Sequence, residues 1–196
     1  MVLSALLQDT TTTTGMSGLE ALITGCAGLV PTMLAYGCPI RGGIALGFGS
    51  SDFIEGEVLS SAQVTAYKLE KEAGYPRILL SDDLVGFLHD HAASPDPAEE
   101  YKRRMAHAAL SSIDTDLDGK PFLNFLSGPL RKRLAGADYD WLLNKAYVFV
   151  AKEAAKWRRR RKDHPDDALA VKLAPRYDLL LGHFERSDLP SPGDRV

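Results

Sequence analysis

Residues 39–84 read PIRGGIALGFGSSDFIEGEVLSSAQVTAYKLEKEAGYPRILLSDDL, and this stretch decides the fold class that the chain indicates. Residues 40–46 are apolar, contain glycine and lie between turn residues. This is typical of a central β-strand whose glycines let another backbone or a ligand approach closely. From about Ser60 the pattern becomes helical, with Ser60 or Ser61 as the N-cap. Residues 77–80 indicate a second buried strand, so the stretch predicts a strand–helix–strand unit.

The residues before this unit indicate one strand and one long helix. Residues 2–7 predict a strand that runs into a polar loop with five consecutive threonines at 10–14. Between residues 19 and 34, apolar side chains recur at helical spacing, which predicts a helix with one broad buried stripe. Pro31 is expected to kink or split that helix. Residues 48–57, inside the quoted stretch, indicate a loop or hairpin.

The residues after the unit are mostly helical. Ser81, with Asp82 and Asp83, is expected to cap a short helix. The pattern then predicts a helix near 99–107, an acidic turn at 113–119 between two strands, and long helices at about 139–162 and 166–185. Pro165 suits the first turn of the last helix, and Pro175 is expected to break it.

Composition is that of a soluble globular protein. The chain has 196 residues, of which 45% are hydrophobic and 25% charged. Its net charge of −3 does not direct it to nucleic acid or to an acidic membrane. Cys26 and Cys38 lie in apolar stretches and indicate a reducing compartment. We find no basic signal-peptide start and no apolar run of membrane-spanning length, so we expect a cytoplasmic protein without a membrane partner.

Several short motifs follow one another in a familiar order. They are Arg41-Gly42-Gly43-Ile44 with Gly47, a helix ending in Leu69-Glu70, Tyr75-Pro76-Arg77-Ile78, and the D-x-D-G element at 116–119. This succession resembles the second half of the catalytic domain of class III nucleotidyl cyclases. It is most similar to the bacterial soluble branch that includes the pyrimidine cyclases of antiphage defence.

The resemblance implies an α+β fold. We expect a partial ferredoxin-like cyclase sheet that lacks its leading strands at residues 1–130, and a helical C-terminal extension at 131–196. A sheet without its leading strands would expose an edge that can pair with another chain. Cyclase domains of this class work as dimers whose sites are shared across the interface, so the resemblance also implies a homodimer.

The family joins the 3′-oxygen of a nucleoside triphosphate to its α-phosphate, using two Mg²⁺ or Mn²⁺ ions held by two aspartates. In this register Lys68 is the catalytic cation, Arg41 and Glu57 are nucleotide-binding, and Val64 stands where the family has Asn. Glu57 does not distinguish a purine from a pyrimidine. The chain starts after the place of the family's metal-binding aspartates, so we expect it to be N-terminally truncated or degenerate, to support no metal ion and to be inactive as given. The alternative is a non-catalytic pseudocyclase that acts as a dimerisation module.

Two other acidic or histidine-containing groups have simpler interpretations. Asp114, Asp116 and Asp118 imitate the start of an EF-hand loop, but Phe125 stands where that loop needs Glu, so a turn between strands is favoured. His89 and His91 are interpreted as surface residues rather than as zinc ligands.

The run Trp157-Arg158-Arg159-Arg160-Arg161-Lys162 lies near the end of a predicted helix. Cations at that position complement the helix dipole, so we interpret the run as a solvated face and do not expect nucleic acid as a partner. Binding of nucleic acid through this run stays open as an alternative function.

Overall fold

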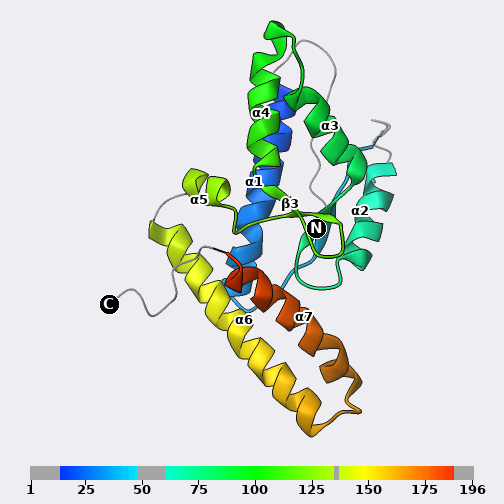
Figure 1. Ribbon diagram of the computed structural model, residues 1–196, viewed down its shortest axis with the longest axis vertical. Coiled ribbons are helices and arrows are strands. Elements are labelled where there is room, and N and C mark those ends of the chain that lie inside the picture. Colours follow the sequence, from blue (N-terminus) through cyan, green and yellow to red (C-terminus); the bar gives the residue numbers. More distant parts are fainter. Residues whose placement is uncertain (1–13, 48–60, 135–136, 188–196) are drawn as a thin grey trace, which may run out of the picture. The chain divides into compact units, whose positions relative to one another are not determined.

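The computed structural model describes residues 14–47, 61–134 and 137–187, and the strand predicted at 2–7, the loop at 48–57 and Glu57 lie outside them. The fold is mixed α+β, with one small mixed sheet among helices (Figure 1). The described residues divide into two compact units. The first contains 14–27, 41–47, 61–73 and 77–124, and the second contains 28–40, 74–76, 125–134 and 137–187.

The sheet of the first unit has the order β1-β2-β4-β3. Its strands are β1 (Gly42–Ile44), β2 (Ile78–Leu80), β3 (Ile113–Thr115) and β4 (Pro121–Leu123). β1 runs parallel to β2, with Gly43 opposite Leu79, and helix α2 (Ser61–Glu72) connects the two strands. β4 is antiparallel to both β2 and β3. The predicted strand–helix–strand unit is confirmed, but β1 is an end strand of the described sheet rather than a central one.

Helix α2 lies so close to β1 and to the residues that follow it that two positions, one in the strand and one after it, have room only for glycine. A Cβ atom on Gly43 would stand 2.2 Å from the Ala66 carbonyl oxygen and 2.7 Å from the Leu69 Cβ. A Cβ on Gly47 would stand 2.6 Å from the Ala62 backbone nitrogen. The close approach predicted for the strand glycines is therefore made by a neighbouring backbone, that of α2.

The core of the sheet forms around β2, whose three residues are all buried. Leu79 packs with Ala73 and Phe122, and Leu69 covers this group from α2. After β2 the chain turns directly into α3 (Asp82–Ala92). The Ser81 side chain accepts a hydrogen bond from the Leu84 backbone nitrogen at 3.3 Å, so the predicted cap is confirmed.

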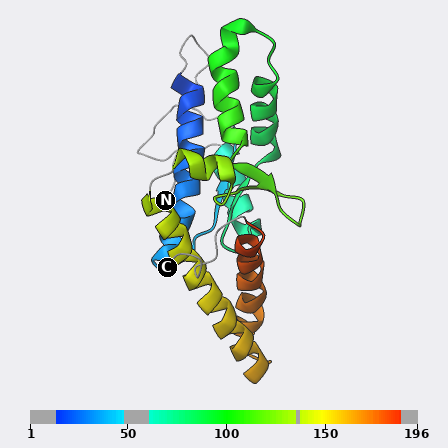
Figure 2. The same cartoon turned by 60° about the vertical axis from the view of Figure 1, so that its left-hand side comes forward.

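Helices α3 and α4 (Glu100–Leu110) pack side by side in both views of the ribbon (Figures 1 and 2). The short 3₁₀ helix η1 (Pro97–Glu99) lies between them in the chain. The chain then forms the β3–β4 hairpin, in which Gly119 has a φ of +78° and donates its backbone N–H to the Asp116 carbonyl. The predicted acidic turn between two strands is confirmed at 116–120, whereas residues 113–115 of the predicted turn form β3 itself.

Helix α1 (Thr14–Ala35) continues through Pro31, so of the two effects predicted for this proline, splitting of the helix is wrong. One stripe of the helix is buried: Met16, Leu19, Ile23, Ala27, Val30 and Leu34. Its segment Gly15–Ala35 is, by length and composition, the one helix of the described chain that could cross a membrane, which corrects the expectation that no apolar run is long enough. A buried core helix has the same length and composition, and the stripe on α1 is consistent with a soluble protein.

The second unit contains α5 (Gly128–Arg133), α6 (Ala137–Asp163) and α7 (Ala168–Glu185). Figure 2 shows α6 and α7 as a hairpin of two helices lying side by side. The Tyr139 hydroxyl is buried and donates to the Phe125 carbonyl at 3.0 Å. Helix α7 continues through Pro175, so the predicted break is wrong. Pro165 lies in the connecting turn rather than in the first turn of α7, which Asp167 caps.

Candidate functional site

Arg41 directly precedes β1 and is tied to α2. Its Nη2 donates to the Oε1 of Glu70 at 2.7 Å, and the two side chains remain 32% and 28% exposed. An ion pair with this much solvent contact contributes little to stability. The guanidinium of Arg41 is therefore accessible to an anionic ligand that competes with Glu70.

Lys68 lies on the opposite side of α2 from β1. It follows Ala66 by two residues, which turns its side chain about 200° around the helix from the position that contacts Gly43. Lys68 is exposed and makes no hydrogen bond or ion pair in the described part of the chain. The structure therefore does not bring Arg41 and Lys68 together, and it does not describe Glu57.

The outer face of α2 consists of Val64, Tyr67, Lys68 and Lys71. Val64 is 56% exposed and Tyr67 is 62% exposed. The Lys71 ammonium lies 4.9 Å from the centroid of the Tyr67 ring, at the distance of a cation–π contact. Two large side chains and two cations thus share one exposed face of α2, at whose edge the exposed Glu72 lies.

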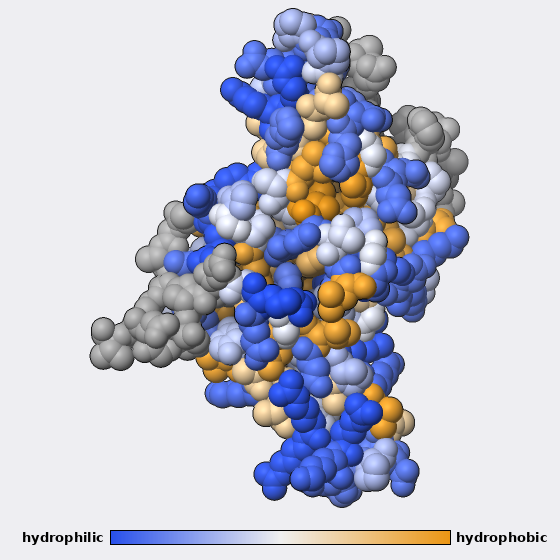
Figure 3. All heavy atoms as spheres, in the orientation of Figure 1, coloured by the Kyte–Doolittle hydropathy of each residue, from blue (hydrophilic) through white to orange (hydrophobic). Residues whose placement is uncertain are grey.

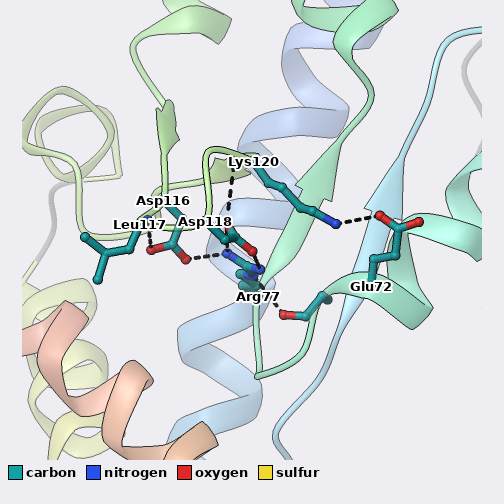
Figure 4. Close-up of polar contacts among 7 residues, drawn as sticks. Glu72, Arg77, Asp116, Leu117, Asp118 and Lys120 are labelled. Atoms are coloured by element: carbon teal, nitrogen blue, oxygen red, sulfur yellow. Dashed lines mark hydrogen bonds and ion pairs between the residues drawn. The ribbon is translucent and has the colours of Figure 1, made fainter.

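A buried arginine connects two of the motifs that carry the resemblance (Figure 4). Arg77, which is 4% exposed, donates from Nε to the Ala73 carbonyl at 2.8 Å. Its terminal nitrogens pair with Asp116 and with both carboxylate oxygens of Asp118, the latter at 3.1 and 2.5 Å. The P-R-I strand and the D-x-D-G turn are therefore held by one guanidinium.

The same turn has a second attachment to α2. Lys120 Nζ lies 2.6 Å from the Oε2 of Glu72 at the end of the helix (Figure 4). The hydrogen bond from Arg77 is the main reason that the pKa of Asp118 is lowered from its ordinary value, against a smaller effect of burial. Both aspartates are partners of the same guanidinium.

This geometry agrees with a turn and not with a calcium loop. Asp116 and Asp118 direct carboxylate oxygens at Arg77, whose positive charge occupies the place that a calcium ion would need. Asp114 accepts hydrogen bonds from the Thr115 backbone nitrogen and the Asn124 side chain, at 2.8 and 3.4 Å. Across the described ranges, no group of three or more His, Cys, Asp or Glu side chains is placed to hold a metal ion.

Sequence reasoning missed the role of Arg77. An arginine next to a buried strand needs acids within reach, and the acidic turn at 113–119 was the available source. The strand predicted at 77–80 and the acidic turn predicted at 113–119, taken together, therefore suggest the pairing of Arg77 with these acids.

The histidines and the basic run have structural roles. His91 stacks against Phe87 with ring centroids 4.3 Å apart, and His89 is exposed. In the run at 157–162, Trp157 is 7% exposed and donates to Glu153 at 2.8 Å. Arg158 pairs with Asp178 at 2.6 Å and Arg160 with Asp167 at 2.5 Å, so two cations of the run are neutralised.

Comparison with known proteins adds no relative: no protein-family model, no curated protein and no solved structure matches this chain.

Proposed function

We propose that this chain is a homologue of the class III nucleotidyl cyclases, corresponding to the second half of their catalytic domain, and that it binds a nucleoside triphosphate as a homodimer. We further propose that the polypeptide as given does not turn the nucleotide over. The observation that carries the proposal is that three of the resembling motifs lie in or next to one sheet, and that α2, which contains the fourth, packs against it.

The parallel pair β1 and β2, joined by α2, supports this assignment. The motif R-x-G-I-x-x-G has glycines at the two positions, 43 and 47, where α2 leaves no space for a side chain. The close packing of α2 requires glycine at both positions, so this packing explains why the motif has glycine there. A ferredoxin-like cyclase sheet contains such a parallel strand–helix–strand unit.

The Arg77 cluster supports it independently. The arginine of P-R-I and the two aspartates of D-x-D-G are 39 and 41 positions apart in sequence and are bonded to each other. Two motifs that were recognised separately thus form one structural element.

The proposed ligand contacts are Arg41, Lys68 and Glu57, with Arg41 and Glu57 binding the nucleotide and Lys68 acting at the phosphates. Arg41 and Lys68 lie on different sides of α2, and this arrangement suits a site to which two chains each contribute one cation. In that role Lys68 would stabilise the negative charge of the phosphates, as preorganised cations do in phosphoryl chemistry.

The donor set of the described residues does not fit the pair of Mg²⁺ or Mn²⁺ ions that the resemblance implies. Asp116 and Asp118, which are close together, are already bound to Arg77. We therefore derive no catalytic step through a metal ion, and the proposal for this polypeptide is binding of the nucleotide alone.

Titration calorimetry with ATP, GTP, CTP and UTP, with and without Mn²⁺, tests the proposal. We expect binding of at least one triphosphate, weakened roughly tenfold or more by Arg41→Ala or Lys68→Ala because each removes a charged hydrogen-bond donor. Lys71→Ala is the matched control on the same face of α2 and should leave the affinity unchanged. Equal losses from all three variants, or no binding of any triphosphate, would contradict the proposal.

A second candidate, the non-catalytic pseudocyclase, is favoured by the exposed Val64. Valine cannot donate the hydrogen bond that the family's Asn makes at this position, whereas 56% exposure suits a protein contact. This candidate predicts a dimer in sedimentation experiments that Val64→Glu dissociates, together with no measurable binding of any triphosphate. Nucleotide binding that survives Val64→Glu, or a monomeric wild type, excludes it.

A further inference from the structure

Helix α6 has an outer stripe opposite its buried face. Its buried positions recur at Leu143, Ala146, Val150, Ala154 and Trp157. The stripe on the other side, with the spacing of one helical face, consists of Trp141, Lys145, Val148, Lys152, Ala155, Lys156, Arg159 and Lys162, all of which are exposed. It extends over about 32 Å at 1.5 Å per residue.

The charges of the stripe differ from those of two arginines of α6 that lie outside it. Arg158 and Arg160 bond closely to Asp178 and Asp167. On the stripe, Lys145, Lys152 and Lys162 have no acid partner in the part of the chain that the structure describes. Arg159 lies 3.5 Å from Asp163 and remains 85% exposed. Lys156 pairs with Glu153 at 2.9 Å, so the positive charge without an acid partner among the described residues is that of Lys145, Lys152 and Lys162.

The beginning of the stripe carries an aromatic pair. The Lys145 ammonium lies 4.7 Å from the centroid of the Tyr36 ring and 4.9 Å from that of Trp141. Tyr36 is 68% exposed and Trp141 is 55% exposed. In Figure 3 the opposite end of the α6–α7 hairpin is mostly hydrophilic. The stripe thus combines exposed rings at one end with cations along its length.

We propose that the outer stripe of α6 binds single-stranded nucleic acid. Cations that follow one line contact successive phosphates, and exposed aromatic rings stack on unpaired bases. Lys145, Lys152, Arg159 and Lys162 are assigned to the phosphates, and Trp141 and Tyr36 to the bases. The site differs from the run at 157–162 that the sequence indicated. Trp157 of that run is buried, and two arginines of the run, Arg158 and Arg160, are neutralised by acids.

Two features favour this occupant over a lipid surface or a duplex. A helix that lies in a membrane inserts a continuous apolar face, but the apolar face of α6 is already buried and the outer Trp141, Val148 and Ala155 alternate with cations. The bases of a duplex are stacked on each other, which leaves the exposed rings without a partner. A single strand offers both phosphates and free base faces.

Fluorescence anisotropy with a labelled oligo-dT of about twelve nucleotides, at several salt concentrations, tests the proposal. The central comparison is between two double variants that each remove two positive charges. Lys145→Gln with Lys152→Gln should weaken binding at least roughly tenfold and reduce the slope of log K against log salt by about 1.4. Arg158→Gln with Arg160→Gln, the matched control, should change the affinity less than twofold.

A stacking variant separates the two kinds of contact. Trp141→Ala should weaken binding by roughly five- to 150-fold and leave the salt slope unchanged, because it removes a base contact and no phosphate contact. Lys68→Ala should bind the oligonucleotide like the wild type, so this test is independent of the triphosphate site. Circular dichroism of each variant verifies that α6 is still folded.

Three outcomes overturn the proposal. They are no binding at 50 mM salt, equal losses from the two double variants, and binding to vesicles that contain phosphatidylserine without binding to the oligonucleotide. The last outcome would assign the stripe to an anionic membrane surface instead.

Discussion

Arg77 donates from both of its terminal nitrogens to the carboxylate of Asp118, although 41 positions separate the two residues in the sequence. Asp116, which is 8% exposed, shares the same guanidinium. A buried cation is stable only when its charge is compensated and its donors are satisfied. This cluster is consequently the first place where a substitution should destabilise the sheet.

Replacing Arg77 by methionine should lower the free energy of unfolding by about 3 to 5 kcal/mol, because Asp116 loses the partner that compensates its buried charge. Urea unfolding followed by circular dichroism measures the change. Arg158→Met is the matched control, since its exposed pair with Asp178 should contribute less than about 1 kcal/mol. A similar cost for both variants would show that burial of the Arg77 pair has no special effect.

The lowered pKa of Asp118 predicts a dependence of stability on acid pH. Below the ordinary pKa of 3.8, the unfolded chain binds a proton that folded Asp118 does not yet take up. The contribution of this group is therefore fully present above about pH 4 and is lost as the pH falls through the folded pKa. The acid limb of a stability–pH curve should be shallower in Asp118→Asn than in the wild type, and parallel limbs would contradict this assignment.

Alanine at position 43 should be destabilising, because its Cβ would overlap backbone atoms of α2 that cannot move away. Overpacking of this kind typically costs about 1 to 3 kcal/mol. Gly86, inside α3, has nothing within 4 Å of an added Cβ. Gly86→Ala should instead stabilise the protein by about 0.5 to 1 kcal/mol, so thermal unfolding of the two variants should shift in opposite directions.

The two helical prolines should respond differently to alanine. Pro175 is exposed within α7, so Pro175→Ala restores a helix N–H without loss of packing and should stabilise by about 1 to 3 kcal/mol. Pro31 is buried, and Pro31→Ala also removes packed side-chain atoms. The gain from Pro31→Ala should therefore be smaller or absent; a larger gain at position 31 than at position 175 would refute this reasoning.

Local patterns predicted the helices well. The helices expected at 139–162 and 166–185 correspond to α6 and α7, and their ends differ from the expected ones by no more than two residues. They could be predicted because the periodicity that buries one face of a helix is present in the sequence of that helix alone. Pro31 was expected to kink or split its helix and Pro175 to break its helix, but both helices continue through the proline. Each loses one backbone hydrogen bond, and the buried residues on both sides of it hold the helix together.

Relationships between distant residues were harder to predict. The acidic turn offered acids for Arg77, but the selection of Asp116 as a partner depends on β4 lying next to β2. The separation of Arg41 from Lys68 could have been predicted, since placing Ala66 toward the strand already turns Lys68 away from it. The position of β1 at the end of the described sheet depends on the pairing order of all the strands, and no short sequence pattern indicates it.

The large sequence separation between Arg77 and its two acidic partners has a consequence during synthesis of the chain. When Arg77 is joined to the growing chain, the acids that compensate it are still 39 and 41 residues from being added. A nascent chain that ends after β2 holds β1, α2 and β2 but cannot bury Arg77, so we expect the first unit to fold only after the β3–β4 turn has emerged. Expression of the chain in two pieces cut between α3 and α4 should accordingly give an insoluble first piece.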